Sequence, residues 1–379
     1  MRIALFTECY HPIVNGVVVS VSTFARELAK QGHDVRIYAP SFPGHHDSEK
    51  NVYRLPSISL PTSPRYPLAI PFGSYLYSRS FMAHQPDVVH AQHPFVTGRE
   101  ARRWARRLDR PLLLTYHTLI HAYAHYVPLP GRLVRAFAVR VSREFSNSTD
   151  AVVVPSQSVG DLLRSYGVRR PIEVIPTGID LDLADAPRQP VRGDYGIPDG
   201  VPVIAYSGRI AREKNLDLLI RAFSLLPGGL REAHLLLVGG GPWYAQGHAL
   251  AESLGLASRV HFTGYLPRSR VFDCLASADA FAFASLTDTQ GIAVLEAMAL
   301  SRPPVAVRSG AVVDVIRDGV DGVLVDPTPE ALAAGLSLVL ESQDFRQALA
   351  GHARARAEEF SAGRMAEKLV RLYARLIRG

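Results

Sequence analysis

Cysteine is scarce in this sequence of 379 residues, which contains only Cys9 and Cys274. Disulfide frameworks and structural zinc sites need more cysteines, or cysteines and histidines at short spacing, so the sequence excludes both classes. No run of 18 apolar residues occurs, which excludes a transmembrane helix. Residues 1–7 predict a core strand, without the apolar segment and cleavage site of a signal peptide. We therefore expect a cytoplasmic protein with reduced thiols.

Basic residues outnumber acidic residues by 42 to 35, which gives a formal net charge of +7. Six arginines gather between Thr97 and Arg110, beside Glu100 and Asp109. Such a surplus favours an anionic partner such as membrane lipid, nucleic acid or an acidic substrate, although a solvated helix face is equally consistent with it. A nucleic-acid binder would also need aromatic stacking platforms or a reading module, which we do not find. We expect no nucleic-acid partner.

Short runs rich in Val, Ile and Leu alternate with helix-length segments along the whole chain. This alternation is typical of the α/β class, in which helices cover both faces of a parallel sheet. The candidate strands of the first half are 2–7, 35–39, 88–92, 112–115, 151–155 and 172–175, and those of the second half are 203–207, 234–238, 260–262, 280–284, 304–306 and 322–325.

These strands predict two doubly wound domains, at residues 1–180 and 201–361. The segment 181–200, with its Pro, Gly and polar residues, is interpreted as a linker. The last helix, within 362–379, is expected to return to the first domain. Ligands of open α/β folds bind at the carboxyl ends of the strands, so we expect two facing domains with a cleft and functional residues in the loops that follow strands.

In the second domain, the strand 203–207 is followed by a loop with Arg209 and Lys214, five residues apart. Both cations can reach one diphosphate and stabilise the negative charge that develops on it as it departs. The alternative is an ordinary pair of surface cations. Their position at the carboxyl end of a strand favours the functional interpretation.

The segment 285–299 follows the strand 280–284 and opens an Ala-rich helix near Gly291. Asp288 lies in the loop, where it can meet the hydroxyls of a sugar. Backbone N–H groups around Gly291 and Ile292 suit a phosphate at the helix start. Glu296 lies among apolar helix neighbours, where an unpaired carboxylate is costly, so a ribose diol would supply a partner. The alternative is a Glu296 paired within its helix.

Further candidates also follow strands. Gly16, just before a helix that ends near Lys30, lets a phosphate approach the backbone, or it is an ordinary turn glycine. His117 follows the strand 112–115 and is either a residue of the cleft or a packed core histidine. The run 262–266, ending in Tyr265 and Leu266, has backbone suited to a nucleotide base, and the triple glycine at 239–241 is interpreted as a close approach for the nucleotide.

Together these segments resemble the GT-B glycosyltransferases, in particular the large retaining family (group 1) that includes sucrose and glycolipid synthases. The family carries two acidic residues separated by seven others, which correspond here to Asp288 and Glu296, although Glu is commoner at the first position. The resemblance assigns Arg209 and Lys214 to the donor diphosphate, Gly16 to the phosphate loop and His117 to the reaction centre. The implied catalytic set is His117, Asp288, Arg209 and Lys214, and the implied donor-binding set is Gly16, Arg209, Lys214, Tyr265, Leu266, Asp288, Gln290, Gly291, Ile292 and Glu296.

A closer resemblance, over residues 116–150, is to the glycosyltransferases that build diacylglycerol glycolipids. Within it, a predicted helix over 132–145 has arginines on one face and apolar residues opposite, as an interfacial helix on an anionic membrane needs. A surface helix docked on its own domain is the alternative. The membrane or acceptor candidates are Tyr126, Arg132, Arg135, Phe137, Arg140 and Arg143.

The resemblance implies a UDP-sugar donor, a hexose (glucose or galactose), a lipid acceptor and a place on the inner face of the plasma membrane. No metal or other cofactor is expected, because the cations of the 208–214 loop replace a metal and the D-x-D at 180–182 falls at the hinge. A soluble acceptor remains an alternative, and a UDP-sugar 2-epimerase a more remote one.

Overall fold

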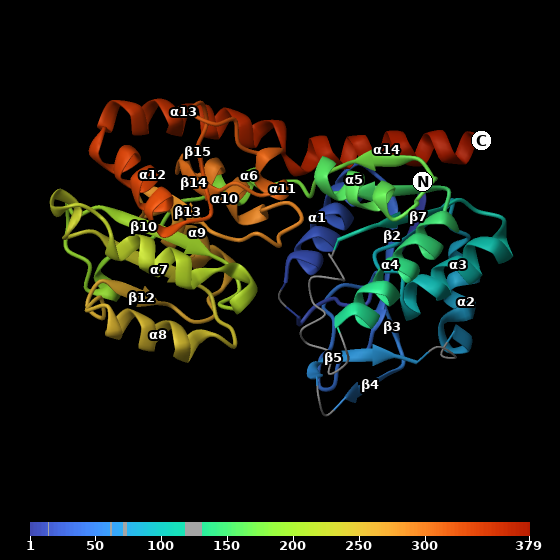
Figure 1. The fold of residues 1–379 in the computed structure, drawn as a ribbon. Helices are drawn as coiled ribbons and strands as arrows, with labels where there is room; N and C mark the ends of the chain where they lie inside the picture. The colour runs from blue at the N-terminus through green and yellow to red at the C-terminus, as the bar shows by residue number, and fades with distance from the viewer. Residues whose placement is uncertain (14, 61–62, 71–73, 118–130) are drawn as a thin grey trace. The chain divides into compact units, whose positions relative to one another are not determined.

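The structure, a computed structural model, describes residues 1–13, 15–60, 63–70, 74–117 and 131–379. These residues form two compact units: unit 1 comprises residues 1–178 and 362–379, and unit 2 comprises residues 179–361. Each unit contains a parallel sheet with helices on both faces (Figure 1), so the expected α/β class with two Rossmann-like units is confirmed. Within the described ranges, no helix combines the length and the apolar character needed to cross a membrane.

The sheet of unit 1 has seven strands in the order β3-β2-β1-β6-β7-β8-β9. The order changes direction at β1, which pairs with β2 on one side and with β6 on the other. The loops after β1, β6 and β7 therefore leave the carboxyl edge beside one another. The strands are β1 (Arg2–Phe6), β2 (Asp34–Pro40), β3 (Val52–Leu55), β6 (Val88–Ala91), β7 (Leu112–Thr115), β8 (Ala151–Val154) and β9 (Ile172–Val174).

Alternate residues of these strands enter two cores, one on each face of the sheet. On one face, Ile3 and Leu5 pack with α1 (Gly16–Lys30) and α14 (Ala362–Arg378). On the other face, Ala4 and Phe6 lie in the second core, which helices from the middle of unit 1 complete. Those helices are α2 (Ser74–His84), α3 (Val96–Leu108), α4 (Gly131–Asn147) and α5 (Gln157–Ser165).

The C-terminal helix α14 belongs to unit 1 and lies beside α1 (Figure 1). Its apolar residues recur at helical spacing, and Met365, Leu369, Leu372 and Tyr373 are buried in the core that α1 shares. The expected return of the last helix to the first domain is confirmed.

Three strands of unit 1 were not predicted. The edge strand β3 has three half-buried residues and so lacks a clear apolar signal. The other two, β4 (Ser57–Leu60) and β5 (Ser63–Ala69), pair antiparallel outside the main sheet. Proline within β5 argues against a strand in a sequence, because proline donates no ladder hydrogen bond.

The sheet of unit 2 has six parallel strands in the order β12-β11-β10-β13-β14-β15, which places β10 directly beside β13. The strands are β10 (Val203–Ser207), β11 (His234–Val238), β12 (Val260–Phe262), β13 (Ala280–Phe283), β14 (Pro304–Val307) and β15 (Val323–Val325). All of them coincide with predicted strands to within one residue at each end.

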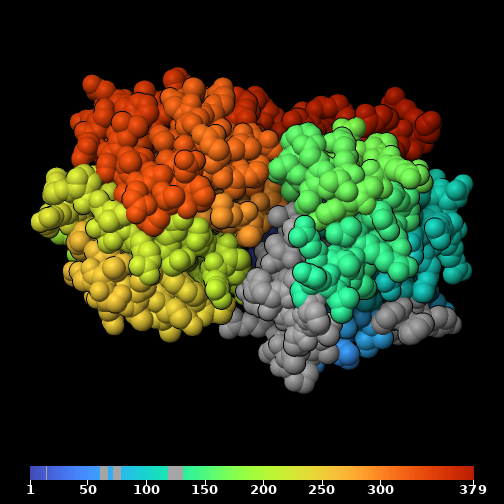
Figure 2. Space-filling model, viewed as in Figure 1, coloured from blue at the N-terminus to red at the C-terminus, as the bar shows by residue number. Residues whose placement is uncertain are grey.

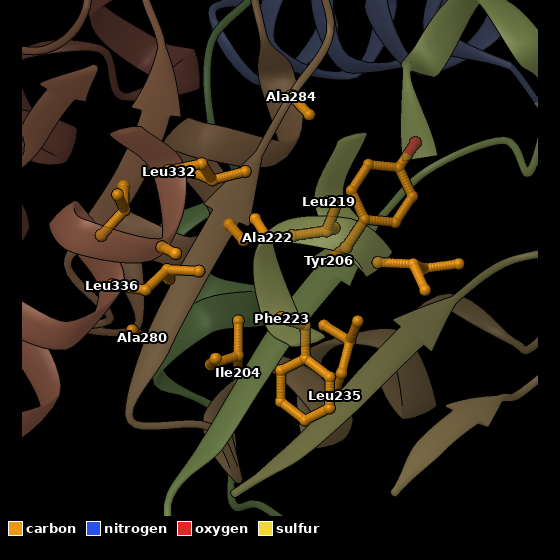
Figure 3. Packing of buried hydrophobic residues seen from close by; sticks show 14 of the residues in the cluster. Ile204, Tyr206, Leu219, Ala222, Phe223, Leu235, Ala280, Ala284, Leu332 and Leu336 are labelled. Atoms are coloured by element: carbon orange, nitrogen blue, oxygen red, sulfur yellow. The ribbon is translucent and has the colours of Figure 1, made fainter. Parts of the chain in front are cut away.

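Two cores again flank this sheet. Ile204 and Tyr206 of β10 pack with α7 and α12 on one face (Figure 3), and Val203 and Ala205 pack with α9 and α10 on the other. The helices of unit 2 are α6 (Leu181–Asp185), α7 (Leu216–Ser224), α8 (Tyr244–Ser253), α9 (Arg268–Ala276), α10 (Ile292–Ala299), α11 (Gly310–Val313), α12 (Pro329–Glu341) and α13 (Gln343–Glu359).

The segment 181–200, interpreted from the sequence as a linker, lies within unit 2. It forms α6 and buries Ala184, Val191 and Ile197 in the core beside α9 and α10. Asp180 caps α6, because its carboxylate accepts a hydrogen bond from the backbone N–H of Leu183 at 3.2 Å. The acidic pair at 180–182 thus begins a helix.

Candidate active site

The carboxyl edge of unit 2 brings Lys214 and Asp288 together. Lys214 lies in a 3₁₀ turn (Arg212–Lys214) after β10, and Asp288 lies in the loop after the adjacent strand β13. Thr287 Oγ donates to the carbonyl of Glu213 at 3.1 Å, which ties the two loops to each other. Lys214 Nζ lies 2.5 Å from Asp288 Oδ1. The sequence pattern predicted both residues at this edge but not their ion pair.

The second carboxylate oxygen of Asp288, Oδ2, is buried and has no hydrogen-bond partner among the described residues. A buried carboxylate oxygen without a donor costs on the order of 1–3 kcal/mol or more, and native sites satisfy such atoms with ligand or water. The atom can therefore accept a hydrogen bond from a water molecule or from a ligand. A sugar hydroxyl fits this requirement.

Arg209 lies in the same loop as Lys214, with 41% of its side chain exposed. Its guanidinium is 3.4 Å from Glu213 Oε1, and its backbone carbonyl accepts a hydrogen bond from the hydroxyl of Tyr206 at 3.2 Å. The backbone is thus anchored to β10 while the cation faces outward. Arg209 can approach an anion from solvent, whereas Lys214 is largely enclosed.

The helix α10 begins as expected, with Gly291 at its N-cap and Ile292 as its first residue. Gly291 has φ +71°, a left-handed conformation that glycine adopts without the penalty of a Cβ. Gln290, just before it, is buried. Glu296 is also buried, and its Oε1 lies 2.5 Å from Arg268 Nη2 of α9. The partner of Glu296 is therefore a cation from another helix, which sequence analysis did not identify.

The triple glycine 239–241 allows close packing of the protein's own loops. The close approach of a nucleotide to the same backbone stays a prediction. A Cβ on Gly239 would lie 2.0 Å from the carbonyl oxygen of Gly208, and one on Gly241 would lie 2.2 Å from that of Ile210. A Cβ on Gly240 would meet the ring of Tyr265 at 2.6 Å. These glycines let the loops after β10, β11 and β12 pack closely together.

Tyr265 and Leu266, the predicted base-binding residues, follow β12 at the same edge of unit 2. The Tyr265 ring covers Gly240 yet leaves 62% of the residue exposed, whereas Leu266 packs against the core beside α9. Tyr265 therefore presents a large apolar surface to solvent at this edge.

At the carboxyl edge of unit 1, His117 Nε2 lies 2.7 Å from Gln92 Oε1. Burial lowers the pKa of His117 well below its usual range, and the nearby His93 and His90 lower that pKa further. Burial also lowers the pKa of His93 to about 4. His117 is therefore a neutral imidazole at physiological pH. It can donate or accept a hydrogen bond but does not supply a positive charge.

Glu8, in the loop after β1, belongs to the same edge and was not selected from the sequence. Its Oε1 accepts a hydrogen bond from the backbone N–H of Thr97 at 2.7 Å, in the first turn of α3, and its own N–H donates to His93 Nδ1 at 3.2 Å. Burial raises the pKa of Glu8, partly offset by hydrogen bonds from the start of α3. Glu8 and His93 each follow a predicted strand, so the criterion that selected His117 applied to them as well, whereas Gln92 was predicted as the last residue of its strand.

Gly16 is the first residue of α1 and is exposed, as a phosphate-binding position requires. Asn15 caps this helix, because its side-chain oxygen accepts a hydrogen bond from the N–H of Val18 at 2.9 Å. One N–H group of the first turn therefore already has a partner within the protein.

Helix α4 carries the predicted membrane residues and lies at the surface of unit 1 (Figure 2). Ala138, Ser142 and Phe145 are buried against unit 1, and of these three only Phe145 belongs to the predicted apolar face. Leu133 and Phe137 are exposed to 64% and 61%. The four arginines 132, 135, 140 and 143 are exposed too, and Tyr126 lies outside the described residues.

Part of α4 thus presents apolar and basic side chains together to solvent. Ser142, on the buried side, lies 2.9 Å from the hydroxyl of Tyr116 and helps to hold the helix on unit 1.

In the described part of the chain, no three His, Cys, Asp or Glu side chains gather as a metal site would require.

Two Rossmann-like units, each built on a parallel sheet, are the architecture of GT-B glycosyltransferases. The chain belongs to the group 1 glycosyltransferases: residues 14–183 match the family model Glycosyltransferase Family 4, and residues 187–356 match Glycosyl transferases group 1. Members of this family are retaining enzymes that use nucleotide sugars, so the protein is such a glycosyltransferase. The family inferred from the sequence motifs is confirmed.

Relatives and solved structures agree with this assignment. The chain is 32% identical over 359 residues to an alpha-monoglucosyldiacylglycerol synthase of Streptococcus pneumoniae, covering 92% of this chain and 80% of that protein. It is 27% identical over 356 residues to a GDP-mannose-dependent alpha-mannosyltransferase of Corynebacterium glutamicum, covering 90% and 81%. A structure of Anabaena Alr3699/HepE in complex with UDP and glucose matches with a TM-score of 0.79 at 19% identity, covering 99% of this chain and 100% of that one.

Proposed function

We propose that the enzyme transfers glucose or galactose from a UDP-sugar to a hydroxyl of diacylglycerol or of a glycosyl-diacylglycerol, at the surface of an anionic membrane. The observation that carries the sugar-transfer site is the buried Oδ2 of Asp288, which has no donor among the residues that the structure describes, while Oδ1 is held by Lys214. The lipid acceptor is supported by the printed activity of the Streptococcus relative and by the exposed apolar and basic residues of α4. UDP is supported by the ligands named for the Anabaena structure.

In the proposed donor complex, Asp288 accepts a hydrogen bond from a hydroxyl of the hexose. Lys214 and Arg209 neutralise the diphosphate, and the N–H groups at Gly291 and Ile292 add a helix start to the same anion. Glu296 accepts the ribose hydroxyls while it remains paired with Arg268. The remaining proposed donor contacts are made by Gly16 at the start of α1, by Gln290, and by the backbone of Tyr265 and Leu266 beside the base.

The proposed transfer proceeds on one face of the sugar. The bond between the anomeric carbon and the diphosphate oxygen breaks, and its electron pair leaves with the UDP. The acceptor oxygen bonds to the anomeric carbon from the same side, and its proton passes to the departing diphosphate oxygen. Lys214 and Arg209 stabilise the charge on that oxygen, and neutral His117 accepts a hydrogen bond from the hexose. Configuration is retained without a covalent enzyme intermediate.

Label transfer tests this proposal. UDP-glucose, UDP-galactose and GDP-mannose, each labelled in the sugar, are incubated with the enzyme in anionic mixed micelles with and without diacylglycerol. We expect label in the organic phase with a UDP-hexose, and only when diacylglycerol is present. Label from GDP-mannose alone would overturn the donor, and label that stays in water in every tube would overturn the lipid acceptor. A changed sugar nucleotide in tubes without acceptor would indicate the epimerase.

A further inference from the structure

A buried hydrogen-bonded chain joins the C-terminal helix to the sheet of unit 1. His90, on β6, uses both ring nitrogens: Nδ1 lies 2.7 Å from the hydroxyl of Tyr373 on α14, and Nε2 lies 2.7 Å from Thr115 Oγ1 at the end of β7. All three residues are buried. Burial lowers the pKa of His90 to about 3, so the ring is neutral and carries one proton between its two partners.

These hydrogen bonds lie next to the residues at the carboxyl edge of the sheet. Gln92, two residues beyond His90, is the first residue after β6, and His117, two residues beyond Thr115, is the second residue after β7. The contact His90–Thr115, here called the lower rung, joins β6 and β7 on the face that α14 covers. The contact Gln92–His117, here called the upper rung, is also 2.7 Å long and joins the segments that follow these two strands.

We propose that Tyr373 and His90 are positioning residues for His117, so that the C-terminal helix sets the geometry of the reaction centre through the lower rung. The proposal rests on the proposed function, in which His117 contacts the donor hexose. The lower rung fixes the side chain of Thr115, the last residue of β7, immediately before the chain leaves the sheet. It also fixes the segment that carries Gln92, so both partners of the upper rung depend on it.

The burial of His90 makes the upper rung depend strongly on the hydrogen bonds of the lower rung. A buried neutral histidine must have a donor for one nitrogen and an acceptor for the other, because an unmade hydrogen bond is costly in the interior. Loss of the Tyr373 hydroxyl leaves His90 Nδ1 without its partner. The proton of the ring is then no longer fixed on one of the two nitrogens. The Gln92 carbonyl oxygen can only accept, so His117 carries its proton on Nε2 in the ordered upper rung.

Tyr373→Phe tests the proposal, because it removes one hydroxyl and keeps the ring packed beside His90. We expect kcat to fall about tenfold, as when one positioning hydrogen bond is lost, while KM for the donor stays unchanged because the donor cations lie in unit 2. With histidine labelled by ¹⁵N in the ring, the His117 resonances should show Nε2 protonated in the wild type and a mixture of tautomers in the variant.

Two further variants separate positioning from stability. Thr115→Ser keeps the hydroxyl of the lower rung and should retain nearly full kcat, whereas Thr115→Val should resemble Tyr373→Phe. Ser142→Ala is the matched control, because it removes a buried hydroxyl that lies 2.9 Å from the Tyr116 hydroxyl, beside the same strand but away from this chain. We expect Ser142→Ala to lower the free energy of unfolding without changing kcat or the His117 resonances.

The outcomes distinguish this proposal from the proposed function. If Tyr373→Phe leaves both kcat and the His117 resonances at wild-type values, or changes them no more than Ser142→Ala does, the positioning role is wrong. If the resonances shift as expected but no sugar is transferred by any form of the enzyme, the coupling is real and the assigned reaction is wrong.

Discussion

Asp288 and Glu296 have the same side-chain chemistry but different surroundings at the edge of unit 2. Asp288 meets Lys214 from the neighbouring loop and keeps one buried oxygen for which the described part of the chain offers no partner, whereas Glu296 meets Arg268 from α9. Their spacing was visible in the sequence. Their partners were not, because Arg268 is 28 residues from Glu296 along the chain and only the packing of α9 beside α10 brings the two together.

The edge of unit 1 illustrates the same limit at the scale of single residues. His117 could be selected because it follows a strand, but its neutral state depends on His93 and on burial, which no local pattern reports. Glu8 is 89 residues from Thr97 in sequence, although their hydrogen bond is 2.7 Å long. Local spacing identifies candidates, whereas the distances between loops decide which of them act together.

Buried neutral histidines in unit 1 predict acid sensitivity. The pKa of His90 is lowered to about 3 and that of His93 to about 4, whereas both titrate near 6.5 when unfolded. The unfolded state therefore binds more protons below pH 6.5, so stability present at pH 7 is lost as the pH falls through that value. Each histidine should cost about 2 kcal/mol of unfolding free energy between pH 7 and pH 5.

Urea unfolding at the two pH values measures this loss. Trp104 lies in unit 1 and Trp243 in unit 2, so Trp243→Phe leaves a fluorophore that reports unit 1 alone. His93→Asn keeps an acceptor for the Glu8 N–H and should reduce the loss by about 2 kcal/mol. An equal loss with and without His93 would show that this residue does not titrate as its burial requires.

At the scale of elements, the apolar pattern predicted twelve strands of the two sheets, including all six of unit 2. It failed at β3 and at the hairpin β4–β5, where edge positions and prolines weaken the signal. It also did not identify the small buried residues Ala138 and Ser142 of α4, which allow close packing on unit 1 while Leu133 and Phe137 of the predicted apolar face remain exposed. Small buried residues carry little weight in a hydrophobic pattern.

Helix α4 gives the prediction for this scale. Arg132→Gln with Arg135→Gln should weaken binding to vesicles that contain an anionic phospholipid about thirtyfold, since each cation near such a surface contributes about 1 kcal/mol. Sedimentation with anionic and with neutral vesicles measures the effect. The double variant Arg221→Gln with Arg231→Gln, at exposed positions of unit 2, changes the net charge equally and should bind as the wild type does. Equal weakening by both doubles would indicate general charge attraction and contradict a role for α4.

At the scale of the whole molecule, the residues proposed for donor binding and those proposed for the acceptor and membrane belong largely to different units. Apart from Gly16, the candidate residues for the nucleotide and diphosphate belong to unit 2, and unit 1 holds Gly16, His117, α4 and the helix that returns at the C-terminus. The sequence predicted both sheets and this return, because alternating strands and helices carry a strong signal along the chain. The placement of 181–200 within unit 2 depends on the burial of three scattered apolar residues, which a composition rich in Pro and Gly concealed.

This division predicts that UDP stabilises one unit selectively. At a concentration of 100 times its Kd, UDP should raise the unfolding free energy of unit 2 by about 2.7 kcal/mol, because a ligand that binds only the folded state shifts the equilibrium by mass action. Trp104→Phe leaves Trp243 to report unit 2, and Trp243→Phe leaves Trp104 to report unit 1. A larger UDP-induced shift in unit 1 would contradict the assignment of the nucleotide to unit 2.

The most direct test of the central claim is the rate of hexose transfer by Asp288→Asn, measured beside its affinity for UDP. The substitution keeps the size of the side chain but removes the negative charge and turns one of its two acceptors into a donor. We predict that transfer to the organic phase falls at least a hundredfold, as when a donor or acceptor aligned with the transition state is lost, while UDP binds as in the wild type or more tightly. Unchanged transfer, or UDP affinity lost in proportion to transfer, would contradict the role of Asp288 in holding the donor sugar.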